Sequence, residues 1–208
     1  MKNNYQIFCE TLQKVKGLEK KPSLLLHCCC APCSTACILQ LKEYFDITVL
    51  YYNPNISPKE EYEKRKTEQI NYINLIAPNG EIKFLDCDYV PTEFYNIAKG
   101  LENCPEKGER CLKCYKLRLE KTCKLAKENG YNYFASTLTL SPLKEEKDIT
   151  KIGIELQTKY DMPYLVSNFK KNNGYLTSIK LSKEFNLYRQ DYCGCVYSKQ
   201  NKNKHFKD

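Results

Sequence analysis

The sequence predicts a single α/β domain of the doubly wound, Rossmann-like kind, with a mainly parallel sheet of about five strands flanked by helices. Short apolar segments typical of buried strands alternate with longer segments of helical periodicity, which indicates a parallel sheet covered on both faces. The length of 208 residues suits one well-buried domain and is short for two. We expect the domain to span residues 1–198 and the basic segment 199–208 to form a disordered tail.

In the first half of the chain, a leading helix is expected within residues 1–22, where apolar residues recur at roughly helical spacing. Three short apolar segments then predict buried strands, at residues 24–27, 47–52 and 81–86. A helix is expected after each strand, beginning at Pro32, Ser57 and Pro91. In the second of these helices, which runs to about residue 76, serine is expected to cap and Pro58 to take the first turn.

The second half of the chain continues the alternation of helices and strands. Its expected helices cover residues 111–129, 143–160 and 181–187. Its expected strands are at 131–135 and 163–166. Ser141 and Pro142 look like the start of the middle helix, and residues 172–174 look like a turn.

The chain contains thirteen cysteines, an odd number, and no leading apolar segment of the signal-peptide type. No apolar run approaches the ~20 residues that span a membrane. We therefore expect a cytoplasmic protein without membrane association, whose cysteines serve metal binding or redox chemistry rather than a disulfide framework.

The formal charge of +8 suits a nucleic-acid partner, although a compositional bias toward Lys, Asn, Tyr and Ile explains it equally well. Arginine is scarce by comparison with lysine. Where Lys is the default cation, an Arg suggests that its forked geometry is needed for a carboxylate or a phosphate. The four arginines are Arg65, Arg110, Arg118 and Arg189.

Five cysteines lie within the run LLLHCCCAPCSTAC at residues 24–37. An apolar strand ends there and Pro32 suits the first turn of a helix, so the cysteines occupy a strand-to-helix turn. Parallel α/β sheets place their ligands at such turns. Because backbone N–H groups at a helix start favour negative charge, we expect Cys29, Cys30 and Cys33 to ionise more readily than free cysteine.

Two further cysteine pairs extend this set. Cys111 and Cys114 have C-x-x-C spacing, and with two thiols of the first run they supply the four thiolates of a 4Fe-4S cluster or of a structural zinc site. Cys193 and Cys195, in a C-x-C arrangement, could form a strained, redox-active disulfide bond or bind a metal. The three motifs together contain more cysteines than one metal ion or one cluster needs, which points to catalysis at or beside the metal centre.

The other cysteines have a simpler interpretation as small core residues. This applies to Cys9, Cys37, Cys87 and Cys123, while Cys28 is expected to face away from its neighbours and Cys104 is left undecided. Phosphate-binding, dinucleotide-binding, zinc-protease and serine-hydrolase motifs are lacking, and two histidines equip the chain poorly for cysteine–histidine hydrolysis. Of the reaction classes considered, redox chemistry is the one that the sequence still supports.

Five motifs in order along the chain resemble the cobalamin-independent epoxyqueuosine reductases called QueH. They are LLLHCCCAPC, YYNPNISPKEEYEKR, GERCLKCYKLRL, FASTLTLSP and YRQDYCGCVYS. The resemblance implies two-electron deoxygenation of the epoxide of epoxyqueuosine, at the wobble position of a tRNA anticodon, to give queuosine. It also implies a tRNA partner and an electron donor that the sequence does not identify.

The resemblance also implies roles for individual residues. Cys29, Cys30, Cys111 and Cys114 look like the ligands of the 4Fe-4S cluster, and Cys193 with Cys195 look like a redox-active pair or the ligands of an additional iron. Cys33 stands where some members carry an aspartate that helps to hold that iron. If these roles hold, the proton that the reaction needs could come from Asp191 or Tyr192 beside the cysteine pair, or from Tyr197 after it. The candidates for binding the nucleoside or tRNA, each of which could equally be structural, are Glu61, Tyr62, Arg65, Arg110, Arg118 and Arg189.

Two alternatives stay open at this point. One is a tRNA-binding α/β module in which the cysteines hold a structural zinc. The other is a thiol-disulfide oxidoreductase that uses Cys193 and Cys195 without a metal, which leaves the other cysteine motifs unexplained.

Overall fold

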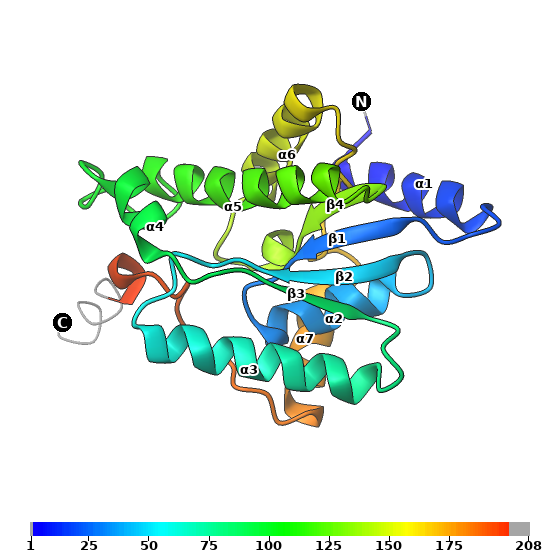
Figure 1. The fold of residues 1–208 in the computed structure, drawn as a ribbon, viewed down its shortest axis with the longest axis horizontal. Helices are drawn as coiled ribbons and strands as arrows, with labels where there is room; N and C mark the ends of the chain where they lie inside the picture. Colours follow the sequence, from blue (N-terminus) through cyan, green and yellow to red (C-terminus); the bar gives the residue numbers. More distant parts are fainter. Residues whose placement is uncertain (1, 200–208) are drawn as a thin grey trace.

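The computed structural model describes residues 2–199 and consists of one four-stranded parallel sheet with helices on both faces (Figure 1). The strands are β1 (Ser23–His27), β2 (Asp46–Tyr51), β3 (Lys83–Asp86) and β4 (Tyr133–Ser136), in the order β3-β2-β1-β4. The helices are α1 (Asn4–Lys16), α2 (Ala31–Leu41), α3 (Lys59–Ile76), α4 (Pro91–Ala98), α5 (Glu109–Glu128), α6 (Glu146–Tyr160) and α7 (Gly174–Glu184), with a 3-10 turn, η1 (Thr137–Leu140). The predicted doubly wound α/β fold is confirmed.

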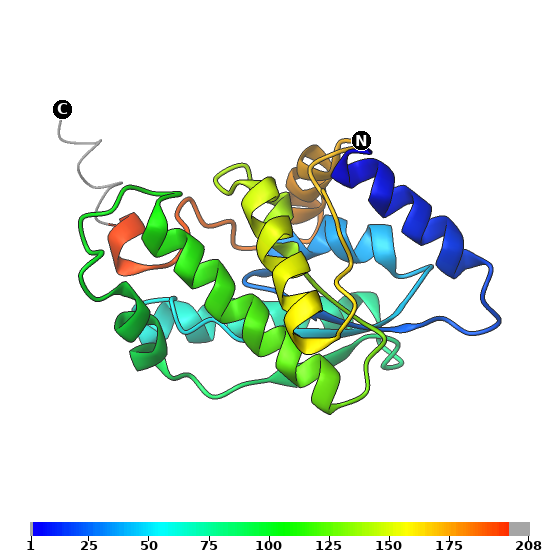
Figure 2. The same ribbon diagram turned by 90° about the horizontal axis from the view of Figure 1, so that it is seen from above.

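The central strand β1 shows why the sheet is covered on both faces. Leu24 and Leu26 lie in the core that α1, α2 and α3 share, whereas Leu25 lies in the core beneath α5 and α6. Successive side chains of a strand point to opposite faces, so an uninterrupted apolar run needs a helix layer on each side. In Figure 2, α5 and α6 lie together on one side of the sheet.

The predicted fifth strand is wrong. Tyr164 makes one isolated parallel bridge with Phe134 of β4, in which the Phe134 N–H donates to Pro163 O and its carbonyl accepts from Leu165 N–H. Pro163 has no N–H to extend the ladder toward the start of the segment, so the pairing stays at one bridge.

Two helix starts in the second half also differ from the prediction. Ser141 and Pro142 follow the turn η1 and precede α6, which begins at Glu146. Helix α7 covers Gly174–Glu184 instead of residues 181–187, so the stretch expected to be a turn leads directly into its first residue. Asn172 and Asn173 have positive φ, 51° and 59°. Asparagine adopts this conformation readily in turns, which is why the sequence indicates a turn here.

Helix α3 begins without the serine cap that the sequence predicts. Pro58 is the N-cap residue and no side chain caps the helix. The N–H of Ser57 instead donates to Gly194 O at 2.9 Å. The start of α3 is thereby tied to the loop that carries the C-x-C pair.

Among residues 2–199, no helix is long and apolar enough to cross a membrane. The predicted disordered tail lies, from residue 200 onward, outside the residues that the structure describes. The division into one domain and a tail therefore stays a prediction.

Candidate metal centre and active site

The carboxyl end of β1 is fixed by the buried His27. Its Nδ1 lies 2.9 Å from Ser136 Oγ at the end of β4, and its Nε2 lies 3.1 Å from the Tyr52 carbonyl oxygen just beyond β2. Burial and the nearby Arg118 charge lower the pKa of His27 to about 4. The imidazole is therefore neutral at pH 7 and joins the ends of three neighbouring strands.

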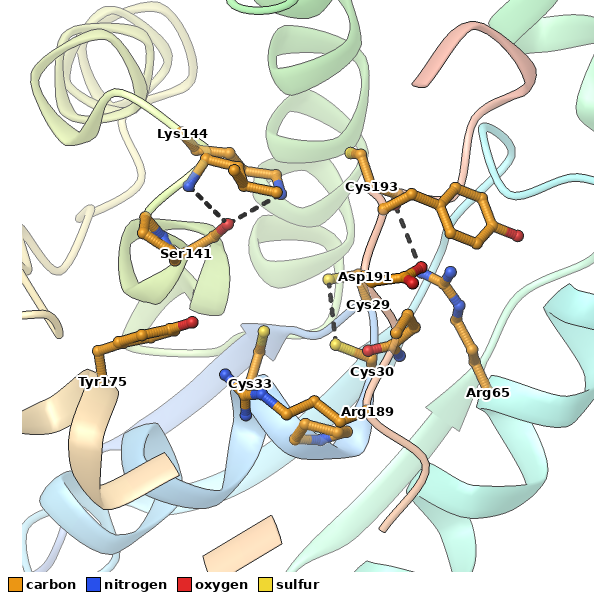
Figure 3. A pocket seen from close by; sticks show the side chains of 15 residues that line it. Cys29, Cys30, Cys33, Arg65, Ser141, Lys144, Tyr175, Arg189, Asp191 and Cys193 are labelled. Carbon is orange, nitrogen blue, oxygen red and sulfur yellow. Dashed lines mark hydrogen bonds between the residues drawn. The ribbon is translucent and has the colours of Figure 1, made fainter. Parts of the chain in front are cut away.

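Beyond His27 the chain delivers three thiols to one cavity of about 210 Å³, where Cys29, Cys30 and Cys33 meet Cys193 (Figure 3). Cys29 Sγ and Cys30 Sγ are 3.9 Å apart. Hydrogen bonds from the Cys30 and Cys33 thiols lower the pKa of Cys29. The same interactions raise the pKa of Cys30, and that of Cys33 to about 12.

The expectation that all three thiols ionise readily therefore needs a correction. A helix N-terminus favours one negative charge at this turn, but two thiolates so close together repel each other. The interactions among the three thiols favour that charge on Cys29, whose pKa is lowered, over Cys30 and Cys33, whose pKa values are raised.

A second group of thiols meets at an adjoining cavity of about 20 Å³, which is lined by Cys111, Cys193 and Cys195. Cys114, one turn further along α5, packs with Cys195 in a small apolar cluster. Burial raises the pKa of Cys114 to about 11 and that of Cys195 to about 12. Because Cys193 lines both cavities, it connects the two groups, and all thirteen cysteines are free thiols here.

The loop that carries Cys193 is held by α3. Arg65 Nη1 donates to the Cys193 carbonyl oxygen at 3.4 Å, and its Nη2 pairs with Glu61 at 2.6 Å. Gly194 has φ +109°, and a Cβ at this position would lie 2.9 Å from Arg65 Nη1. A glycine is therefore required between the two cysteines, both for its φ and for the close approach of Arg65.

Two buried cations face the thiols without a carboxylate partner. Arg118 is 1% exposed, and neither Nη1 nor Nη2 has a hydrogen-bond partner in residues 2–199. Lys144 is 5% exposed and makes a 3.4 Å hydrogen bond to Ser141 Oγ. Burying a cation without a counter-charge is costly, so this site suits an anionic group.

The donor set indicates what that anionic group is. Thiolates are the ligands of iron–sulfur clusters and of zinc, and a thiolate-bound cluster carries negative charge that the cations can balance. No three His, Cys, Asp or Glu side chains in the described part of the chain have the arrangement of a single-ion site. A four-iron cluster does not require such convergence, because its four cysteines bind different irons.

Two residues predicted to bind substrate make contacts within the protein. The Tyr62 hydroxyl donates to Cys87 O at 3.2 Å, and its ring lies 4.2 Å from that of Tyr89, centroid to centroid. Arg110 Nη1 donates to the carbonyl oxygens of Leu101 and Glu102, both at 2.9 Å. Both side chains are buried, Arg110 Nε has no hydrogen-bond partner in the described residues, and the substrate-binding role of the two residues stays a prediction.

The other predicted binding residues differ in how far their side chains are exposed to solvent. Arg189 is exposed at the cavity, where its guanidinium lies 5.3 Å from the ring centroid of Tyr175. Asp191 and Tyr192 line the same cavity. Arg118 is buried and lines neither thiol cavity, so Arg189 is better placed to reach a phosphate on the surface.

The residues of this cavity that sequence reasoning missed include Lys144 and Tyr175. Lys144 lies two residues after the end of the quoted motif FASTLTLSP, and in a lysine-rich chain its type carries no signal. Tyr175 is one of seventeen tyrosines and lies in a helix that was predicted further along the chain.

The fold and the site together define a doubly wound α/β protein with a thiol-lined, positively charged pocket at the carboxyl edge of its sheet. The family description "Epoxyqueuosine reductase QueH" matches residues 24–201. The chain is 46% identical over 201 residues to Epoxyqueuosine reductase QueH of Streptococcus pyogenes serotype M1, covering 95% of this chain and 78% of the relative. This chain belongs to the epoxyqueuosine reductase QueH family and is an oxidoreductase.

Further comparisons agree with this assignment. Epoxyqueuosine reductase QueH of Thermotoga maritima is 35% identical over 179 residues, 85% of this chain and 90% of the relative. Among solved structures, the U34-tRNA thiolase NcsA from Methanococcus maripaludis with its [4Fe-4S] cluster has a TM-score of 0.54. That match covers 93% of this chain and 69% of the thiolase at 12% identity, and it supports the fold.

Proposed function

We propose that this chain reduces epoxyqueuosine in tRNA to queuosine at the thiol-lined cavity. In this reaction both C–O bonds of the epoxide break and a C=C bond forms, with two electrons and two protons consumed and the oxygen released as water. The observation that carries the proposal is the set of free thiols facing the buried cations Arg118 and Lys144, in a chain of this family. The electrons come from a donor outside the chain, because each turnover consumes them.

We assign Cys29, Cys30, Cys111 and Cys114 as ligands of a 4Fe-4S cluster. Cys33, Cys193 and Cys195 would then remain to bind an additional iron, for which their side chains would have to move closer together, or the last two to act as a redox-active pair. When bound, the cluster supplies electrons one at a time. A reducing compartment such as the cytoplasm would keep these thiols available for metal.

The side chains at the cavity would position the nucleoside. Arg189, which is exposed at the rim, would bind a phosphate of the anticodon loop through its forked guanidinium. Tyr175 presents a ring on which an unstacked base can lie, the usual way in which proteins hold a single-stranded nucleotide. Asp191 and Tyr192 line the same cavity and are candidates to deliver the protons.

Metal content tests the first part of this proposal. Protein purified or reconstituted without oxygen is expected to contain about four irons and four acid-labile sulfides per chain, with a visible charge-transfer band. Cys30→Ser should lose most of this iron, whereas Cys9→Ser, a change in helix α1, should keep it. Colourless protein that binds zinc and no sulfide would instead support the structural zinc site.

Turnover tests the second part. Reduced wild-type protein should convert epoxyqueuosine in tRNA to queuosine, detected by mass spectrometry of the digested nucleosides. Cys30→Ser should be at least 100-fold slower and Cys9→Ser should match the wild type. Equal turnover of Cys30→Ser and wild type would rule out the assigned role of Cys30.

A further inference from the structure

Lys144 is a buried ammonium group that lines both thiol cavities. An ammonium group has three donors. In the described residues its Nζ makes one hydrogen bond, to Ser141 Oγ at 3.4 Å, and no ion pair with a carboxylate. The donors that remain have no acceptor among residues 2–199.

The backbone holds Lys144 in place through the segment between η1 and α6. The N–H of Lys144 donates to Ser141 O at 3.2 Å, and its carbonyl accepts from Lys170 Nζ at 2.7 Å. Ser141 N–H in turn donates to Leu138 O at 3.2 Å. Figure 3 shows the Lys144 side chain beside Ser141, across the cavity from Asp191 and Arg65.

The two buried cations occupy different positions relative to the cavities. Arg118 lines neither cavity, and from within the protein it favours the thiolate forms of the nearby Cys114 and Cys29. Lys144 forms part of both cavity walls. Arg118 is therefore placed as a counter-charge for the thiolates, whereas Lys144 can also reach a molecule that enters the larger cavity.

Lys144 remains charged in this position. The larger cavity that Lys144 lines also contains the thiol groups of Cys29 and Cys193, and the thiolate forms of these groups would favour the charged form of Lys144. A charged donor in a water-poor cavity stabilises a developing negative charge more strongly than it would in water.

Resting on the proposed function, we propose that Lys144 is a catalytic residue whose ammonium group donates a hydrogen bond to the epoxide oxygen of the substrate. As the C–O bonds break, negative charge develops on this oxygen, and Lys144 stabilises it. The two protons of the released water come from solvent, directly or through other side chains at the cavity. Lys144 is an ammonium group before and after the reaction.

The test compares Lys144→Met, which keeps the length and removes the charge, with Lys144→Arg and with a control. The control is Lys147→Met, an exposed lysine one turn further along the chain. Each protein is loaded with iron, fully reduced and mixed with tRNA that carries epoxyqueuosine, in a single turnover. Lys144→Met is expected to be about 100-fold slower or more, the range for loss of one such donor. Lys144→Arg should recover part of the rate and Lys147→Met all of it.

The reduction potential separates this role from that of a counter-charge. Removing a positive charge beside the thiolates should lower the potential and make the reduced protein a stronger reductant. If Lys144 acted only as a counter-charge, Lys144→Met would react as fast as the wild type or faster, and that result would overturn the inference. Loss of iron from Lys144→Met that is restored in Lys144→Arg would overturn it as well.

Binding provides a readout without turnover. Oxidised wild-type protein should bind tRNA carrying epoxyqueuosine several-fold more tightly than tRNA carrying queuosine, which lacks the oxygen. Lys144→Met should lose this preference while its affinity for queuosine tRNA stays the same. An unchanged preference would exclude the hydrogen bond. If wild-type protein does not turn over, the proposed function fails, whereas equal turnover of wild type and Lys144→Met refutes only the role of Lys144.

Discussion

At the scale of single residues, burial divides the cysteines into those that can react and those that cannot. Cys37 and Cys123 are fully buried, one in each of the two cores. Cys9 and Cys104 are partly exposed. The segment 24–37 therefore contains both thiols that line a cavity and thiols that lie in the core. The surroundings of each cysteine, rather than the motif in which it occurs, decide whether it can react.

Alkylation of native, metal-free protein tests this division. At pH 8 we expect iodoacetamide to modify Cys9 and Cys104 within minutes and to leave Cys37 and Cys123 unmodified. Burial raises the pKa of Cys123 to about 11, so only about one such thiol in a thousand is ionised at pH 8. Peptide mapping by mass spectrometry gives the result. Modification of Cys123 at the rate of Cys9, without unfolding, would contradict it.

The residues at the site could be predicted from the sequence only in part. Cysteine spacing identified the thiols, because C-x-x-C and C-x-C pairs have few other uses in a reducing compartment. Spacing could not show which thiol carries the charge, since this depends on hydrogen bonds among Cys29, Cys30 and Cys33. Nor could it find Lys144, whose importance comes from burial.

At the scale of elements, apolar periodicity located the strands and long helices, whereas the site depends on how the segments between them are held. The loop with Cys193 and Cys195 has no periodicity. Its geometry comes from the backbone of Gly194, the N–H of Ser57 and the side chain of Arg65. Such contacts between distant segments leave no local pattern in a sequence.

A substitution at Gly194 tests the importance of this loop. Gly194→Ala should reduce turnover at least tenfold, because its Cβ would lie 2.9 Å from Arg65 Nη1 and 3.1 Å from Ile56 Cγ1, which displaces the cysteines. Gly100→Ala is the matched control, since Gly100 also has positive φ, +78°, but has nothing within 4 Å of a Cβ. Both variants should lose about 1 kcal/mol of stability from backbone strain.

Thermal unfolding and iron content complete this experiment. Gly100→Ala should keep wild-type iron content and turnover despite its lower melting temperature. Equal losses of turnover in the two variants would show that strain alone, rather than contact with Arg65, accounts for the effect of Gly194→Ala.

At the scale of the whole molecule, the strand order fixes where the site lies. In the order β3-β2-β1-β4, strands β2 and β3 lie on one side of β1 and β4 lies on the other. The direction of winding therefore reverses, and the switch point lies between β1 and β4. A crevice opens at the carboxyl end of such a switch point. The thiols of residues 29–33 and the segment 141–144 lie there, which is why the position of the site follows from the alternation of strands and helices.

The positive charge of the molecule has a measurable consequence for tRNA binding. Affinity should fall steeply with salt, because counterions are released from each neutralised phosphate. Arg189→Gln should weaken binding several-fold and reduce the slope of log K against log salt by about 1. Lys14→Gln changes an exposed lysine in the last turn of α1 that lines neither thiol cavity, and it should leave both unchanged. Fluorescence anisotropy at several salt concentrations measures both quantities, and equal slopes for Arg189→Gln and wild type would exclude a phosphate contact.

The walls of the larger cavity come from segments that are far apart in the sequence, residues 29–33 and 189–193. During synthesis on the ribosome, the first wall emerges long before the second has been translated. Until residue 193 has folded into place, the early cysteines lie open to oxidants and to adventitious metals. Any group that both walls hold can be inserted only after translation has passed this point, and until then the nascent chain must be kept reduced.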